Sequence, residues 1–151
     1  MEIFAQEGTT HDYPERYNFN NNFIELRNHG EIAMGAPLAG GLFINGTEAS
    51  LLNGKEYCHY TFGGPIILTE KYIYIPLFET RGKEHKAIKP THLDCPTDFP
   101  GYYISRVSYN GNIEILSEKF PLVHLIKKED NTLFFRARYK GEIKSIEIPP
   151  E

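Results

Sequence analysis

Apolar and polar residues alternate along several short stretches of the chain. Between residues 132 and 140 one parity holds Leu133, Phe135, Ala137 and Tyr139, and the other holds Phe134, Arg136 and Arg138. Because successive side chains of a strand point to opposite faces, this pattern predicts a half-buried strand with an arginine-bearing outer face. Residues 72–75 read YIYI, which predicts a strand covered on both sides. Pro76 should then lie at a bulge or on a sheet edge.

Turn signals separate these stretches. Asn-Gly pairs favour the two-residue type I′ hairpin, and the chain has them at 45–46, 53–54 and 110–111. Further polar or glycine-containing breaks between apolar runs predict hairpin loops at 28–30, 129–131 and 140–141. Near the end of the chain, Ile143 and Ile146 have opposite parity, which predicts a bulge near Ser145.

The fold class follows from these runs and turns. The expected strands are 23–27, 31–34, 41–45, 55–62, 65–69, 72–78, 101–109, 113–117, 122–127, 132–140 and 142–148. The 10 prolines and 13 glycines leave few windows in which a three-turn helix could form. The sequence therefore predicts an all-β fold, an antiparallel meander of about ten short strands. A sandwich, a barrel or a partial propeller-like arrangement would accommodate such a meander.

Two segments depart from the strand pattern within the single domain expected for residues 1–151. Residues 5–22 are polar and rich in asparagine, which predicts an irregular N-terminal arm. Residues 79–100 predict a long loop, with Ala87 and Ile88 as its only apolar pair. Loops of this length inside a compact domain are usually functional or mobile, so function is expected here. A crossover that ties two sheets together is the alternative.

Composition and charge narrow the class of protein. The chain carries 20 acidic and 16 basic side chains, a formal net charge of −4, which argues against a general phosphate-binding surface. Its two cysteines, Cys58 and Cys95, exclude a disulfide-dense scaffold and are expected to be free thiols. The first ten residues lack the pattern of a secretory signal, and no apolar run is long enough to span a membrane. We therefore expect a cytoplasmic protein with no membrane partner.

Candidate catalytic and metal sites are poorly supported. Cys58 and His59 are neighbours in a predicted strand and would point to opposite faces, so they cannot readily join His92 and Cys95 around one zinc ion. Asp94 stands beside Cys95 and disfavours a thiolate nucleophile. The sequence contains no G-x-S-x-G elbow. It predicts no catalytic residue, no metal and no cofactor.

Three arginines raise the question of nucleic-acid binding. Arg106, Arg136 and Arg138, with Phe134 interleaved, resemble a platform for single-stranded nucleic acid. On an acidic protein such arginines are more often surface charges, here expected to pair with Glu142 or Glu147. We therefore predict no direct contact with nucleic acid.

Short apolar runs and turn dipeptides follow one another along the chain, as in FIEL at 23–26, NG at 53–54 and YIY at 72–74. In size, acidity and this sequence character, the chain resembles the immunity proteins of bacterial contact-dependent and polymorphic toxin systems. The resemblance implies a non-catalytic protein that forms a tight one-to-one complex with a cognate toxin, often a basic nuclease, and blocks its active site. Acidic side chains around a tyrosine-lined patch would steer and then anchor such a partner.

The expected contact surface is the long loop and its flanks. The residues predicted to bind the partner are Glu79, Glu84, Asp94, Asp98, Tyr102 and Tyr103. One of the two tyrosines is expected to face outward as an aromatic anchor. The alternative function is a small-ligand- or carbohydrate-binding β-barrel, possibly an enzyme, with residues 79–100 as its lid.

Overall fold

The computed structural model describes residues 2–3, 15–31, 38–52, 55–56, 61–79, 101–138 and 140–151. These residues form strands and turns and contain no helix, which confirms the all-β prediction. The strands are β1 (Glu2–Ile3), β2 (Arg16–Phe19), β3 (Asn22–Glu31), β4 (Leu38–Ile44), β5 (Thr47–Glu48), β6 (Leu51–Leu52), β7 (Lys55–Glu56), β8 (Thr61–Gly63), β9 (Ile67–Leu68), β10 (Tyr72–Glu79), β11 (Gly101–Ser108), β12 (Asn112–Ile115), β13 (His124–Glu129), β14 (Thr132–Arg136) and β15 (Ile143–Glu147).

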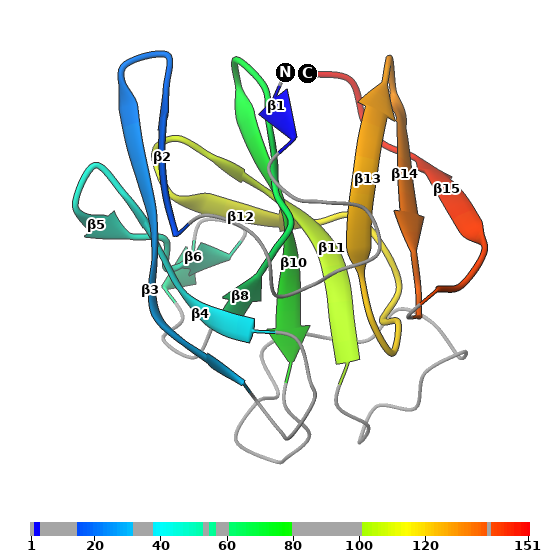
Figure 1. Cartoon of the computed structure of the whole chain (residues 1–151). Coiled ribbons are helices and arrows are strands. Elements are labelled where there is room, and N and C mark those ends of the chain that lie inside the picture. The colour runs from blue at the N-terminus through cyan, green and yellow to red at the C-terminus, as the bar shows by residue number, and fades with distance from the viewer. Residues whose placement is uncertain are drawn as a thin grey trace.

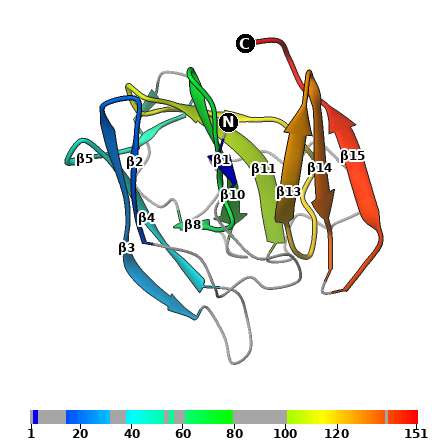
Figure 2. The same cartoon turned by 45° about the horizontal axis from the view of Figure 1, so that its top comes forward.

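The strands form two sheets of very different size. The larger has twelve strands, nine of them in the order β2-β3-β4-β8-β10-β11-β12-β6-β7, and it curves strongly (Figures 1 and 2). Its pairings are antiparallel except that between β12 and β6. The described strands at the two ends of this order do not pair, so the sheet is not closed into a barrel. The smaller sheet has the order β13-β14-β15 and packs beside β10 and β11.

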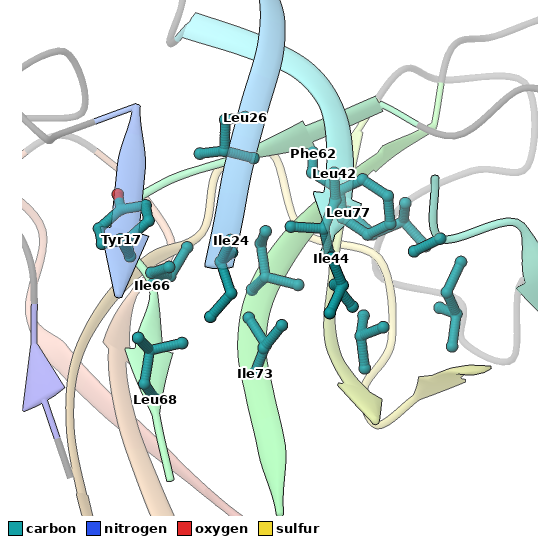
Figure 3. Close-up of a cluster of buried hydrophobic side chains, with 14 of the residues drawn as sticks. Tyr17, Ile24, Leu26, Leu42, Ile44, Phe62, Ile66, Leu68, Ile73 and Leu77 are labelled. Carbon is teal, nitrogen blue, oxygen red and sulfur yellow. The ribbon is translucent and has the colours of Figure 1, made fainter. Parts of the chain in front are cut away.

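Strands β10 and β11 form a wall between two hydrophobic clusters. On one side, Ile73 and Ile75 of β10 join the cluster inside the curved sheet (Figure 3). On the other, Tyr74 and Phe78 join a second cluster with the inner face of the small sheet. Residues 73–78 are all buried, so the predicted strand covered on both sides is confirmed. This double coverage is a sandwich-like arrangement.

The small sheet confirms the predicted alternation. Leu133 and Phe135 are at most 1% exposed and belong to the second cluster, whereas Phe134 and Arg136 are half-buried on the outer face. The register of β14 with β15 is continuous from Thr132 to Arg136, so the bulge predicted near Ser145 is wrong. Ile143 has the opposite parity to Ile146 because it faces outward, 52% exposed. The register shift of this sheet lies in β13, between residues 125 and 127.

Most of the described turns agree with the sequence. Asn45 and Gly46 both have positive φ between β4 and β5, as a type I′ turn requires. The predicted loops at 129–131 and 140–141 connect paired strands of the small sheet. At 110–111 only Gly111 has positive φ, so this turn is a longer loop and not type I′. The pair at 53–54 lies outside the described residues.

The N-terminal predictions need two corrections. Within the predicted arm, Arg16–Phe19 forms β2 and pairs with β3. Asn20 and Asn21 both have positive φ, because asparagine tolerates the left-handed conformation that a two-residue hairpin needs. The predicted loop at 28–30 lies inside β3, where the register with β4 shifts. Residues 4–14 and 32–37 lie outside the described residues.

Pro76 lies in the interior of β10, where the pairing with neighbouring strands is interrupted on one side. On one side β10 pairs with β9 at Tyr74 and with β8 at Leu77, and Pro76 lies between these two pairings. Its missing N–H therefore falls where β10 has no ladder partner on that side. On the other side Pro76 is opposite Ile104 of β11.

Candidate functional site: a cationic pocket at one end of the small sheet

A pocket of about 410 Å³ lies where β14 and β15 are connected, at the end of the small sheet away from the C-terminal residue (Figure 1). We call this region the pocket end. Its walls combine three cationic side chains, one carboxylate and three apolar residues. They are Lys119, Phe120, Pro121, Ala137, Arg138, Glu142 and Lys144.

The first wall is the segment that precedes the small sheet. Phe120 and Tyr102 exchange backbone hydrogen bonds, each N–H donating to the other carbonyl at 2.7 Å. A Cβ placed on Gly101 would lie 2.7 Å from Cγ of Lys119 and 2.8 Å from the carbonyl oxygen of Phe120. The lack of a side chain at Gly101 therefore lets this wall approach β11 closely.

The second wall is the connection between β14 and β15. The Gly141 N–H donates to the Arg138 carbonyl at 3.0 Å, and Nε of Arg136 donates to the Gly141 carbonyl at 2.8 Å. A Cβ on Gly141 would lie 2.6 Å from Cγ of Arg138. Hydrogen bonds and a glycine contact thus fix the turn that presents Arg138.

Aromatic packing supports the apolar side of the pocket. The ring centroids of Phe120 and Phe135 are 5.0 Å apart, so Phe120 rests on a fully buried residue of β14. Nζ of Lys144 lies 6.0 Å from the centroid of the Phe120 ring. A cationic group and an aromatic face therefore adjoin inside one pocket.

Two of the three cations in the pocket have no carboxylate partner among the described residues. Lys119 is 1% exposed, whereas Arg138 and Lys144 are exposed. Neither Arg138 nor Lys144 forms an ion pair with a carboxylate of the described residues, Glu142 included. Because Arg138 and Lys144 are exposed cations in its walls without such partners, the pocket can accept a negatively charged group.

The opposite end of the small sheet also gathers charge, but there the charges are paired. The carboxylate of Glu151 accepts hydrogen bonds from Tyr74 at 2.7 Å and from the hydroxyl of Thr69 at 2.8 Å. Nζ of Lys128 lies 3.8 Å from the same carboxylate. We call this set, together with Arg106, the clasp, because it ties the C-terminal residues to the large sheet.

Arg106 is the most buried member of the clasp that carries a charge. Its guanidinium donates to both carboxylate oxygens of Glu114, at 3.0 and 3.1 Å, and to the Pro149 carbonyl at 2.8 Å. It also lies 4.2 Å from the centroid of the Tyr72 ring. Arg106 is 4% exposed, and these contacts use most of its donors.

Burial raises the pKa of two tyrosines near these regions. The pKa of Tyr102, in the second cluster, is raised to about 12 by burial. Burial raises the pKa of Tyr109 to about 12 as well, with a smaller contribution from the negative charge of Glu151. The Tyr109 hydroxyl donates to the Thr69 carbonyl at 2.7 Å, which links it to the clasp.

Of the residues predicted to bind a partner, some are buried in the structure and others lie outside the described residues. Glu79 ends β10 opposite Gly101, and residues 80–100, with Glu84, Asp94 and Asp98, lie outside the described residues. Tyr102 is 4% and Tyr103 0% exposed, so the expectation that one of them faces outward is wrong. The physical reason is that β11 is covered on both faces, with Tyr103 in the first cluster and Tyr102 in the second.

Arg106, Arg136 and Arg138 do not form one platform. Arg106 lies in the clasp, on the large sheet, and is buried. Arg136 belongs to β14 and Arg138 lies on the connection that follows it, and Arg138 forms no ion pair with Glu142 or Glu147, contrary to the expectation. The candidate metal and thiol residues at 58, 59, 92 and 95 lie outside the described residues.

A charge count along the sequence points to the small sheet as a whole, with Lys127 and Lys128 lying away from the pocket end. Residues 119–144 carry seven Lys and Arg and three Asp and Glu, whereas the whole chain has 16 and 20. This basic stretch in an acidic chain is a sequence signal that no single motif contains.

Comparison with known proteins identifies no relative. No protein-family model matches the chain, and no curated protein or solved structure matches it. Among the described residues, no group of three or more His, Cys, Asp and Glu side chains could hold a metal ion, and no helix could cross a membrane.

Proposed function

We propose that the protein is a binding protein that occludes a protein partner, and that it contacts this partner through the pocket end of the small sheet. The function is that expected of an immunity protein, which neutralises a cognate toxin by forming a complex. The observation that supports the proposal is a pair of exposed cations, Arg138 and Lys144, without carboxylate partners among the described residues, beside the exposed Ile143.

The surroundings of this pair suit a protein interface. Ile143 is 52% exposed on the outer face of β15, and the side chain of Lys144, the next residue, points to the opposite face, so an apolar group and a charge flank this edge strand. Interfaces commonly combine an apolar centre with a polar, charged rim. The hydrogen bonds of the turn hold the backbone of this surface before a partner arrives, which lowers the entropic cost of binding.

The charge of the pocket end bears on the partner's chemistry. Arg138 and Lys144 complement an acidic patch, and charge complementarity raises the association rate. The basic toxin predicted from the sequence would instead meet the acidic residues between 84 and 98, outside the described residues. We therefore propose an acidic group of the partner at the pocket end, and the basic surface remains a prediction for the loop.

Co-expression with the product of the adjacent gene, followed by affinity capture and a growth-rescue assay, tests the proposal. Ile143→Asp should abolish or strongly reduce capture and rescue, since it places a carboxylate in the apolar centre of the interface. Phe23→Asp is the matched control. Phe23 is 37% exposed, on the hairpin of β2 and β3 that Figure 1 shows on the far side of the large sheet.

The outcome of this pair is decisive. Loss of capture in Ile143→Asp with retention in Phe23→Asp supports the proposal. Equal capture by both variants and the unmodified chain contradicts the proposed surface. If the unmodified chain captures no product of a neighbouring gene, the occlusion function itself is contradicted.

A second candidate function is the binding of a small ligand. The pocket, at about 410 Å³, lies within the range of small-molecule sites, about 300–1,000 Å³. Its mixture of Phe120, Pro121 and cationic groups would suit a small organic anion. Binding of a metabolite-sized anion by the purified chain, with no captured protein, would favour this candidate.

A further inference from the structure

We propose that the pocket is a carboxylate site, and that it takes an acidic side chain of the partner together with a neighbouring apolar group. This inference rests on the proposed function for the source of the carboxylate. The chemistry of the site itself rests on the walls of the pocket.

The first argument is the arrangement of the donors. Arg138 enters the pocket from the β14 side of the connection and Lys144 from β15, so two cations reach it from opposite arms of one hairpin. A guanidinium fork matches the two oxygens of a carboxylate, and an ammonium adds a point charge. The position of Gly141 against Cγ of Arg138 fixes where this arginine leaves the backbone.

The second argument is the apolar side. Phe120, Pro121 and Ala137 line the same pocket, and Phe120 is supported from behind by Phe135. An inorganic ion would leave these surfaces in contact with water. A carboxylate on an apolar body would cover them while its charge meets the cations, so the pocket favours the organic anion.

The third argument concerns the one carboxylate in the walls. Glu142 stands between the turn and Lys144 and is exposed. Its negative charge repels any bound anion and repels a doubly charged one more strongly. Glu142 therefore favours a singly charged carboxylate over a phosphate dianion. The smaller pocket at Ile44, Asn45, Thr47, Tyr109, Asn110 and Gly111 has no lysine, arginine or carboxylate in its walls.

Nuclear magnetic resonance titration of the full ¹⁵N-labelled chain tests the site without the partner. The probes are phenylacetate, its neutral analogue phenylacetamide, and inorganic phosphate. Phenylacetate should shift the amide signals of Phe120, Ala137, Arg138 and Lys144 at millimolar concentration. Phenylacetamide and phosphate should bind at least about fivefold more weakly, since each lacks one of the two features that the pocket recognises.

Four variants assign the effect to the proposed groups. Arg138→Ala and Lys144→Ala should each weaken phenylacetate binding by about three- to tenfold, and Glu142→Gln should strengthen it by about twofold. Lys140→Ala is the control, because Lys140 lies on the same connection but does not line the pocket. Its affinity should stay within about twofold of the unmodified chain after the loss of the same charge.

A pair of short peptides distinguishes the source of the carboxylate. N-acetyl-Phe-Glu-amide should bind more tightly than both N-acetyl-Phe-Gln-amide and phenylacetate if the site takes a partner's side chain. Tighter binding of phenylacetate would overturn the protein source and leave a site for small organic anions.

The remaining outcomes overturn the carboxylate site itself. They are equal binding of phenylacetamide, tighter binding of phosphate, or an equal loss of affinity in Lys140→Ala and Arg138→Ala. Because these measurements use no partner, the carboxylate site can fail while affinity capture succeeds through another surface. The carboxylate site can also be supported by these measurements when affinity capture of a partner fails.

Discussion

The two ends of the small sheet contain the same kinds of residue but use them differently. In the clasp, Arg106 meets both oxygens of Glu114 and a carbonyl, and Glu151 accepts from Tyr74 and Thr69. At the pocket end, Arg138 and Lys144 meet no carboxylate of the described residues, although Glu142 is close in sequence. Charges whose donors are used within the fold stabilise it, whereas exposed charges without partners contribute little to stability and remain available for binding.

Burial explains why the two ends differ. Arg106 is 4% exposed, and a buried charge without hydrogen bonds would cost several kcal/mol, so the fold must supply partners. Arg138 is exposed and is hydrated by water at little cost. The clasp thus supplies partners for charges that the fold buries, whereas the exposed cations of the pocket end need no partner within the fold.

The largest expected effect is the loss of the buried guanidinium. Arg106→Ala should lower the free energy of unfolding by about 3 kcal/mol, because it removes three donated hydrogen bonds and leaves a cavity beside Tyr72. Arg138→Ala should change it by less than about 0.5 kcal/mol. Urea unfolding of both variants checks the comparison, and equal losses would show that the two ends do not differ.

Gly101→Ala should have the next largest effect, this time at the pocket end. The new methyl group would meet the Phe120 carbonyl at 2.8 Å, so the wall of the pocket must move. We expect a loss of about 2 kcal/mol in the free energy of unfolding, as for other overpacked sites. Gly46→Ala is not a suitable control for this variant. A Cβ on Gly46 would meet nothing within 4 Å, and the positive φ of +87° would itself strain an alanine.

A suitable reference is therefore Phe23→Ala, an exposed change on the far hairpin, which should cost less than about 1 kcal/mol. If Gly101→Ala unfolds at the same urea concentration as the unmodified chain, the wall is not held against β11 as the close approach implies.

Glu151→Gln should weaken the clasp more modestly. The neutral amide keeps the size of the side chain but removes the charge that accepts from Tyr74 and lies near Lys128. We expect a loss of about 1 to 2 kcal/mol, measured by urea unfolding. Glu147→Gln on the edge strand, where Oε1 accepts from Thr132 on an exposed surface, should lose less than about 0.5 kcal/mol. A larger loss in Glu147→Gln would contradict the special role of the clasp.

The last effect is absent at neutral pH and should appear only at alkaline pH. An unfolded tyrosine loses its proton near a pKa of about 10, whereas the pKa values of folded Tyr102 and Tyr109 are raised to about 12. Between these values the unfolded chain binds fewer protons than the folded one, so stability falls as pH rises from about 10 to 12. Tyr109→Phe should reduce the slope of this fall, and an unchanged slope would show that Tyr109 does not contribute to it.

Part of the fold could be predicted because it depends on local patterns. The alternation around Phe134 places one parity of β14 in the second cluster and the other on the outer face. The positive φ values at Asn45 and Gly46 follow from the turn chemistry of these two residues. The YIYI run is buried on both faces because both parities are apolar, whatever covers them.

The candidate site could not be predicted in the same way. Tyr102 and Tyr103 have a residue type suited to binding, yet β11 lies between two clusters and buries both. Arg106 and Arg138 both stand on predicted strands, and no local pattern says which of them meets a carboxylate. The pocket joins Phe120 to Lys144 across the width of the small sheet, which requires the packing of that sheet against β11.

The all-β class, the alternation of β14 and the positive φ of Asn45 and Gly46 follow from the sequence, because they depend on side-chain alternation and on residues within a few positions of one another. Only the tertiary structure shows that β11 is covered on both faces, that Arg106 is paired with a carboxylate while Arg138 is not, and that cations from separate segments line one pocket. These features depend on which distant segments bury one another. A buried charge requires a partner within the fold, whereas an exposed charge is solvated by water and does not.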